Sequence, residues 1–507
     1  MLIFTIERYK PNTINVMNRD SLRVQGVQRT LYAGALITLV LCFGCVFSPS
    51  ILNWDEGYYI NTALGFASDG SLSVKMWKLP NAGTLINGGG QGYGFLIYLI
   101  FLKLTGNSVH YARLFAYLFA GLSLWLCFRF VSSIAGKNAG IFASAFYAVS
   151  IVFFHFISAR FDAVAIAVTF LLLIAFKKVS KTNSALAHAS LGALLVLGLE
   201  FHVNIAAVIF AVSCLYICAL LWKRILGREF FGFSVTVKNG ISFFCALAIC
   251  STIYIYLHFA NGSEAFFIIT RSCLQCGIPF PQREYIRFSD LISRYSLEFA
   301  FVAVSFIWAA FRPSLYLWLF VFSLLFFIAF IPPHYEFFLW PVVSPLVGEF
   351  LEWAVLKNSR VTGKIVLFGL FLVWFRTVAV SLDRITPSGK AMSIIDAARC
   401  VRNHSSNKDT VLAPAPYFIY LRDYINFVEL GSGMKYAALL SGKNLEGFSH
   451  VKFLEEVNPK IVWIGKSDWR ASEDIAEAYV RSHSCNEICI DSGDRSKAPA
   501  GKIYSCR

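Results

Sequence analysis

Charged side chains are scarce in this chain: Asp, Glu, Lys and Arg make up 15% of its 507 residues, while hydrophobic residues make up 57%. A soluble globular domain carries about 25% charged residues, so the composition excludes an ordinary soluble protein. Five stretches contain none of these four residue types, namely 30–54, 138–159, 201–222, 239–263 and 313–335. A helix of roughly 20 apolar residues crosses the hydrocarbon of a membrane. The sequence therefore predicts a polytopic protein embedded in the lipid bilayer.

Other features are missing as well. We find no internal repeat, which many transporters have, and no low-complexity tract. The C-terminal tail has no glycine-rich phosphate loop, because Gly431-Ser-Gly is too short. The net charge of +15 is spread over short segments between the apolar stretches rather than gathered on one soluble surface. Nucleic-acid binding is therefore not expected.

The apolar stretches predict an all-α membrane domain of about eleven transmembrane helices. We expect them near 31–53, 109–128, 138–157, 161–176, 185–200, 203–222, 239–258, 296–311, 314–332, 336–356 and 364–382. Lys and Arg collect in the N-terminal head and in alternate connections, and the positive-inside rule makes that face cytoplasmic. An odd number of spans then places the tail outside the cytoplasm. The expected location is the cytoplasmic (inner) membrane.

This topology divides the chain into three parts. Residues 1–30 form a cytoplasmic segment, residues 31–382 form the membrane domain with outer loops 54–108 and 259–295, and residues 383–507 form an extracytoplasmic domain. The tail mixes a helical pattern (Met392, Ile395, Ala398, Val401) with short β-like runs beginning at Thr410, Lys460 and Gly501, which indicates a small α/β domain. Cysteines at 273, 276, 485, 489 and 506 could form disulfides if the outer compartment is oxidising. A zinc site at Cys273 and Cys276 would lack two further ligands.

The first outer loop begins with a pair of carboxylates, Asp55 and Glu56. Residues 57–67 are expected to form a short helix, and 95–102 form an apolar helix too short to span, which we place at the membrane interface. Carboxylates just outside a span can act as a general base or bind a cation. They can equally stabilise the N-terminus of the following helix, so both interpretations stay open.

Further polar groups adjoin apolar stretches on the same predicted side. They are Arg160 and Asp162, Glu200 and His202, and His334 and Tyr335. Each has an ordinary structural interpretation: an ion pair for Arg160 and Asp162, a buried histidine for His202, and a broken helix end for His334. Their shared side of the membrane is the reason to suspect an active site.

The order of these motifs resembles that of the GT-C glycosyltransferases. The motifs are a first span followed by Asp55-Glu-x-x-Tyr59, a long outer segment, Gly106-Asn-Ser-x-x-x-x-Arg113 at the second span, and Ser158-Ala-Arg-Phe-Asp162 before the fourth. The resemblance covers roughly residues 30–355. It is greatest to bacterial enzymes similar to protein O-mannosyltransferases and to aminoarabinose or galacturonosyl transferases that modify lipid A. One departure is Gln91, which stands where lipid A transferases typically carry an acid–Lys–Pro triplet.

The resemblance implies an inverting sugar transfer from a polyprenyl-phosphate donor to a lipid, glycan or protein acceptor. The implied catalytic residues are Asp55 as the base, with Glu56 and Asp162. The implied donor-binding residues are Arg160, Arg113, Lys75, Gln91, Glu200, His202, His334 and Tyr335, with Lys78 and the arginines of 271–287 as further candidates. No cofactor is firmly implied, although Asp55, Glu56 and Asp162 could gather a divalent cation.

Two alternatives remain. A membrane transporter would also bury ionisable groups, and an O-antigen ligase or polymerase-like enzyme would concentrate its signals in a late outer loop. The arginine-rich segment 271–287 keeps the second alternative open.

Overall fold

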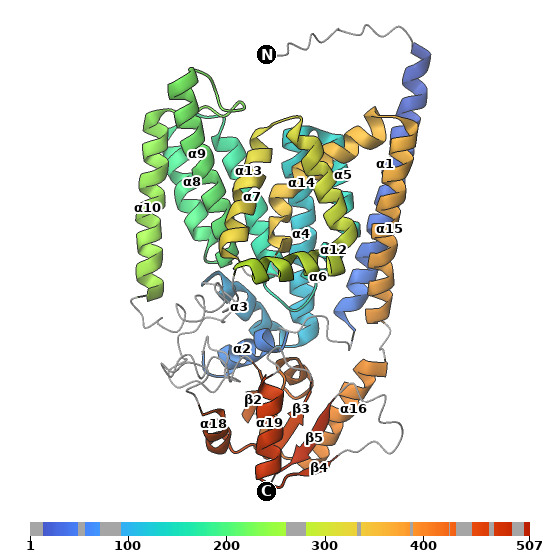
Figure 1. The fold of residues 1–507 in the computed structure, drawn as a ribbon, viewed down its shortest axis with the longest axis vertical. Coiled ribbons are helices and arrows are strands. Elements are labelled where there is room, and N and C mark those ends of the chain that lie inside the picture. Colours follow the sequence, from blue (N-terminus) through green and yellow to red (C-terminus); the bar gives the residue numbers. More distant parts are fainter. Residues whose placement is uncertain are drawn as a thin grey trace.

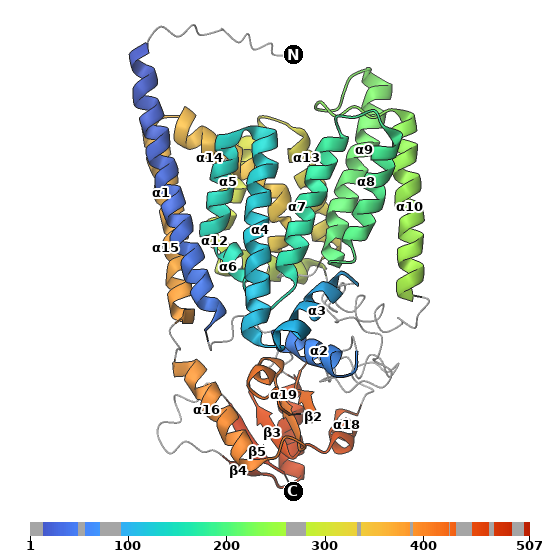
Figure 2. The same cartoon turned by 180° about the vertical axis from the view of Figure 1, so that it is seen from behind.

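The computed structural model describes residues 14–48, 56–70, 93–259, 280–331, 336–385, 389–424, 426–431, 449–465, 471–488 and 501–506. Helices form a tall bundle, and a small α/β domain built from the C-terminal part of the chain lies at one end of it (Figures 1 and 2). Two short helices, α2 (Glu56–Asp69) and α3 (Leu96–Thr105), lie between the bundle and this C-terminal domain.

The bundle contains a helix in each of the eleven stretches expected to span the membrane. Its helices are α1 (Ile14–Val46), α4 (Val109–Ala135), α5 (Lys137–Val149), α6 (Ile151–Phe156), α7 (Asp162–Val179), α8 (Ala185–Gly198), α9 (Ala206–Leu226), α10 (Val237–Phe259), α12 (Phe280–Ala310), α13 (Leu315–Phe330), α14 (Trp340–Glu352) and α15 (Arg360–Ile385). Short turns named η4 (Val203–Ile205), η5 (Glu336–Leu339) and η6 (Trp353–Lys357) adjoin α9 and α14. By length and composition, seven helical segments of the described residues could cross a membrane. The chain is a multi-pass membrane protein, and the exact count of eleven stays a prediction.

The structure corrects three expected boundaries. Helix α1 begins at Ile14, so part of the expected polar head is helical, and it ends at Val46. The span expected at 138–157 is broken at Ser150, whose extended backbone (ψ 153°) separates α5 from α6. Helix α12 begins well before the expected residue 296 and has a non-helical residue, Tyr295, at its bend.

The Gly106-Asn-Ser motif has a clear local role, which is to join α3 to α4. Gly106 has a positive φ of 89°, and its N–H donates to the carbonyl oxygen of Leu102, which ends α3. Ser108 then caps α4 by accepting a hydrogen bond from the N–H of His110. This turn fixes where the first residues of α4 lie, including Arg113 in its second turn.

The C-terminal domain is the small α/β unit that the tail pattern predicts. Its described elements are α16 (Gly389–His404), β1 (Thr410–Ala413), η7 (Ala415–Tyr420), β2 (Asn426–Glu429), α18 (His450–Val457), β3 (Ile461–Ile464), α19 (Ala471–Ser482), β4 (Asn486–Ile488) and β5 (Lys502–Ser505). The strands form one sheet in the order β2-β1-β3-β5-β4, in which β1 pairs in parallel with β2 and β3 while β5 is antiparallel to β3 and β4. The central strands are almost wholly apolar and buried, as is typical of a sheet covered on both faces.

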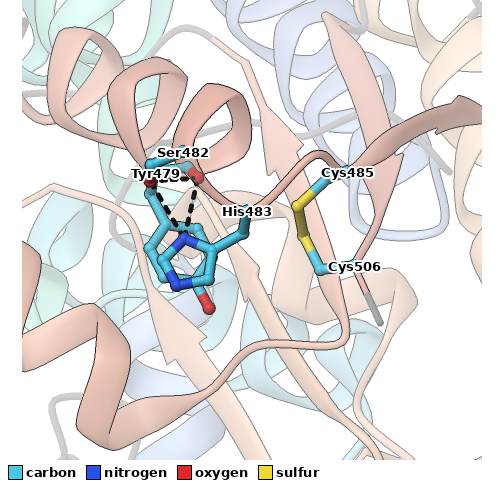
Figure 3. The surroundings of a disulfide bond; sticks show 5 residues. All are labelled: Tyr479, Ser482, His483, Cys485 and Cys506. Atoms are coloured by element: carbon cyan, nitrogen blue, oxygen red, sulfur yellow. Dashed lines mark hydrogen bonds between the residues drawn. A yellow bond between two sulfur atoms is a disulfide. The ribbon is translucent and has the colours of Figure 1, made fainter.

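A disulfide between Cys485 and Cys506 closes the far end of this domain (Figure 3). It joins the turn after α19 to the residue after β5. Next to it, the rings of Tyr479 and His483 stack with their centroids 4.0 Å apart. The expectation of a disulfide in the tail is confirmed for this pair, and Cys400 is disulfide-bonded as well. Cys273, Cys276 and Cys489 lie outside the described residues.

Candidate functional site

Glu56 and Arg113 form a fully buried ion pair at the end of the bundle that faces the C-terminal domain. Arg113 Nε and Nη2 donate to the two carboxylate oxygens of Glu56 over 2.8 and 2.7 Å. Arg113 Nη1 also donates to the carbonyl oxygen of Ser48, over 2.6 Å. This two-pronged geometry is the strongest form of the arginine–carboxylate interaction. The pair therefore ties the start of α2 to α4 and to the end of α1.

The Ser158–Asp162 motif touches this pair and carries a second one. The N–H of Ala159 donates to Glu56 Oε1 over 2.8 Å. The next residue, Arg160, pairs with Asp162, the first residue of α7, at 2.8 Å between Nε and Oδ2. Glu56 and Asp162 therefore converge, as the shared side of the sequence motifs predicts.

His202 lies against the second pair. Its Nε2 is 3.7 Å from Asp162 Oδ1, and its Nδ1 accepts a hydrogen bond from the N–H of Asn204. The ring therefore carries its proton on Nε2, toward Asp162. Burial, reinforced by the charge of Arg160, lowers the pKa of His202 to about 3. His202 is thus a neutral hydrogen-bond donor in this cluster.

Glu200 contacts the backbone of the first outer loop. Its carboxylate Oε2 accepts a hydrogen bond from the N–H of Tyr93 over 2.7 Å, and its carbonyl oxygen accepts one from Gly94 over 3.0 Å. A Cβ at Gly94 would come within 2.7 Å of that carbonyl oxygen, so a glycine is required there. Glu200 therefore fixes the residues just before α3.

The C-terminal domain contacts α2 next to Glu56. The hydroxyl of Tyr58 donates to Glu429 Oε1 over 2.6 Å, and both residues are buried. A Cβ at Gly57 would lie 1.9 Å from the carbonyl oxygen of Ala415, at the start of η7. The backbone of α2 thus packs directly on the C-terminal domain, so this domain helps to fix the segment that Glu56 begins.

One polar residue at this end was missed by the sequence analysis, His155 in α6. Its Nε2 is buried and has no hydrogen-bond partner in the described part of the chain. Its ring centroid is 4.6 Å from that of Phe337 in η5. The available signal was a histidine near the end of the otherwise uncharged stretch 138–159.

An apolar groove adjoins this region and has a volume of about 290 Å³. Helices α12, α13 and α14, together with η5, line it with side chains such as Val302, Phe320 and Trp340. Arg287 and Glu298 bring the only charges among its described lining residues. Arg376 of α15 pairs with Glu298, with 3.4 Å between Nη1 and Oε2.

Five of the expected site residues lie outside the described residues: Asp55, Lys75, Gln91, His334 and Tyr335. Their roles stay predictions. A cation held by Asp55, Glu56 and Asp162 also stays a prediction. Within the described ranges no group of three or more His, Cys, Asp and Glu could hold a metal ion. Both described carboxylates of that set have arginine partners instead.

The architecture is a helical bundle with buried ion pairs at the end that faces a small α/β domain. Solved structures with a similar fold agree with the resemblance expected from the sequence. The chain is similar to ArnT from Cupriavidus metallidurans bound to undecaprenyl phosphate, with a TM-score of 0.54 and 11% identity over 95% of this chain and 98% of that one. The apo state of ArnT gives 0.52, also at 11% identity with the same coverage. The Archaeoglobus fulgidus oligosaccharyltransferase tethered with an acceptor peptide gives 0.48 at 9% identity, over 85% of this chain and 68% of that one. No protein-family model and no curated protein sequence matches the chain.

Proposed function

We propose that this chain is a glycosyltransferase of the cytoplasmic membrane that moves a sugar from a polyprenyl-phosphate donor to an acceptor on the extracytoplasmic side. The observation that carries the proposal is the double role of the Ser158–Asp162 motif. Ala159 bonds to Glu56 and the adjacent Arg160 pairs with Asp162, so two motifs distant in sequence meet at one site. The fold shared with ArnT supports it, because the solved ArnT structure holds undecaprenyl phosphate. That molecule is what remains when such a donor loses its sugar.

In this proposal Asp55 is the general base. It takes the proton of the acceptor hydroxyl, whose oxygen attacks the anomeric carbon of the donor. The bond from that carbon to the phosphate oxygen breaks on the opposite face, its electrons leave with polyprenyl phosphate, and the configuration inverts. Glu56, the residue after the proposed base, is held by Arg113 and by the N–H of Ala159.

The leaving phosphate gains charge as the bond breaks, so a nearby cation stabilises the transition state more than the ground state. Arg160 is the cation that we assign to this task, with Asp162 orienting its guanidinium. His202 would donate from Nε2 to a phosphate or sugar oxygen. Lys75, Gln91, His334 and Tyr335 remain proposed donor contacts. Arg113 is assigned chiefly to holding Glu56.

The apolar groove is the proposed place for the polyprenyl tail. Its lining is aliphatic and aromatic over several helices. A lipid tail gains little hydrophobic free energy there, because the bilayer is equally apolar. The groove would therefore orient the donor through shape, while the charged groups at the site supply most of the specificity.

The test is transfer by the purified protein in lipid nanodiscs, offered a panel of polyprenyl-phosphate sugars, with release of polyprenyl phosphate as the readout. Asp55→Asn should slow transfer by about 10²–10⁴-fold while donor binding persists. Arg399→Gln, an exposed change on α16, serves as the control and should transfer normally. Full activity of Asp55→Asn would remove Asp55 from the base role.

Mass spectrometry of envelope glycolipids and glycoproteins, with and without the chain, gives the complementary result in cells. A changed glycan identifies the acceptor. If no glycan changes while the uptake of a solute does, the protein is a transporter.

A further inference from the structure

A second cavity, of about 320 Å³, lies where α16 and η7 of the C-terminal domain meet the ends of α1 and α4. Its described polar lining residues are Ser48, Ser108, His110, Arg113, Arg402, Tyr420 and Arg422. None of its described lining residues also lines the apolar groove. The cavity is therefore a separate space, shared between the membrane bundle and the C-terminal domain.

The lining carries more positive than negative charge. Glu56 offsets the charge of Arg113, and Asp423 pairs with Arg402 at 3.1 Å. Arg422 makes no ion pair within the part of the chain that the structure describes. The N-terminus of α4 adds partial positive charge and has no acidic residue in its first turn to offset it. The cavity thus favours an anion, and guanidinium groups match the geometry of a phosphate.

Aromatic side chains beside the cavity are exposed on the surface of the protein. Phe47 and Tyr111, which directly adjoin the lining residues Ser48 and His110, have 55% and 45% of their surface exposed. The rings of Phe47 and His110 are stacked, with their centroids 6.2 Å apart. Exposed aromatic side chains at the ends of apolar helices are typical of the headgroup level of a membrane. A phosphate on a lipid headgroup would reach the cavity at that depth.

We propose that this cavity binds the phosphate of an anionic lipid headgroup and so fastens the C-terminal domain to the membrane bundle. The phosphate lies between Arg402 and Arg422 on the domain side and the first turn of α4 on the bundle side. The site goes beyond the proposed sugar transfer, because the bound lipid need not be a substrate. Arg113 lines this cavity, so the proposed lipid site also adjoins the Glu56–Arg113 ion pair.

The experiment compares the full chain in nanodiscs of phosphatidylcholine alone with nanodiscs that also contain phosphatidylglycerol. A third arm adds inorganic phosphate to the phosphatidylcholine nanodiscs. Hydrogen–deuterium exchange of η7 and the first turn of α4 reports occupancy, and native mass spectrometry counts retained lipids. Wild type should show slower exchange with phosphatidylglycerol. Arg422→Gln, which removes one charge-assisted hydrogen-bonding group, should bind that lipid about tenfold more weakly.

Two variants separate the site from general electrostatics. Arg399→Gln removes the same charge from the same domain, but Arg399 does not line the cavity, so it should behave as wild type. Arg402→Gln should weaken binding as Arg422→Gln does. If loss of its Asp423 pair unfolds that variant, Arg422→Gln still decides, because it breaks no described ion pair.

Each outcome decides the proposal. Protection by phosphatidylglycerol that depends on Arg422 supports it. If only inorganic phosphate protects, and this protection again depends on Arg422, the cavity binds phosphate but the ligand is not a lipid headgroup. Equal protection of wild type and Arg422→Gln overturns the site itself. Binding is measured without sugar transfer, so failure of the proposed function would leave these results unaffected.

Discussion

Two Glu–Arg pairs in this protein differ in how completely they are buried. Glu56 and Arg113 have 0% and 1% of their side chains exposed and share two short hydrogen bonds. Glu298 and Arg376 have 5% and 28% exposed and share a single contact of 3.4 Å. The first pair also binds the backbone of Ser48 and Ala159.

The difference indicates separate tasks. A fully buried ion pair is tolerated only when both partners have their hydrogen-bonding groups satisfied. Loss of one partner leaves the other as a buried, unpaired charge. Such a pair suits the fixed end of the bundle, where α1, α2, α4 and the start of α7 must keep one arrangement. The partly exposed pair can lose a partner at lower cost, since Arg376 is not enclosed by the fold. Its Glu298 lines the groove, whose proposed occupant must enter and leave.

The largest effect is expected from Glu56→Gln. Arg113 would stay buried without a carboxylate, which costs about 3–5 kcal/mol of stability. Unfolding of the purified protein in detergent measures the loss, and Glu56→Gln/Arg113→Met should be more stable than the single variant because it buries no lone charge. A loss below about 1 kcal/mol in Glu56→Gln would contradict the buried pair.

The next effect concerns the contact between α2 and the C-terminal domain. In Gly57→Ala the new Cβ would meet the carbonyl oxygen of Ala415, so α2 must shift, at a cost of about 1–3 kcal/mol. Sugar transfer should fall with it, because Glu56 and Asp55 move too. Gly121→Ala in α4 is the control, since nothing lies within 4 Å of its Cβ, and it should be neutral or slightly stabilising. Normal transfer by Gly57→Ala would show that the domain contact does not position the site.

The sequence predicts much of this end of the molecule, because its signals are local. The helix at 57–67, the short apolar helix at 95–102 and the strands at Thr410, Lys460 and Gly501 are all present. Periodicity and length suffice for such elements. The convergence of Glu56 with Asp162 could also be predicted, since topology places both on one side of the membrane.

The break between α5 and α6 could not be predicted in this way. The stretch 138–159 is mostly apolar, contains no Asp, Glu, Lys or Arg, and contains no proline. What stabilises the break is distant: Glu298 Oε1 accepts a hydrogen bond from the N–H of Ile151, a backbone group near the break. The pairing of Arg113 with Glu56 is equally non-local, since the two residues are 57 positions apart. The resemblance implies a catalytic role for Glu56 and donor binding for Arg113, and neither role predicts that they pair.

A smaller effect is expected from Arg376→Gln. The variant breaks the 3.4 Å contact with Glu298 and removes the guanidinium that donates to the carbonyl oxygen of Arg294. Because the side chain is partly exposed, about 1–2 kcal/mol of stability should be lost. Glu298 keeps its hydrogen bond from Ile151, so the break between α5 and α6 should persist. The same unfolding measurement compares the stability of this variant with that of Glu56→Gln. Equal losses of stability in the two variants would contradict the distinction between the fully buried pair and the partly exposed pair.

The smallest effect at neutral pH is expected from a change at His202, a buried neutral group near the end of the bundle that faces the C-terminal domain. Burial holds the pKa of His202 near 3 in the folded protein, whereas a histidine in the unfolded chain has a pKa of about 6.5. Between these two pH values His202 is therefore neutral in the folded state and protonated in the unfolded state. The unfolded state therefore binds more protons between these values, and stability falls as the pH drops through that window. His202→Asn keeps an acceptor for the N–H of Asn204 but removes this titration. Unfolding midpoints of wild type and variant should differ by a constant above pH 7, and wild type should lose relatively more stability below about pH 6.5. Parallel curves across the whole range would show that His202 has the same pKa in the folded and unfolded states, and so would contradict its burial as a neutral group.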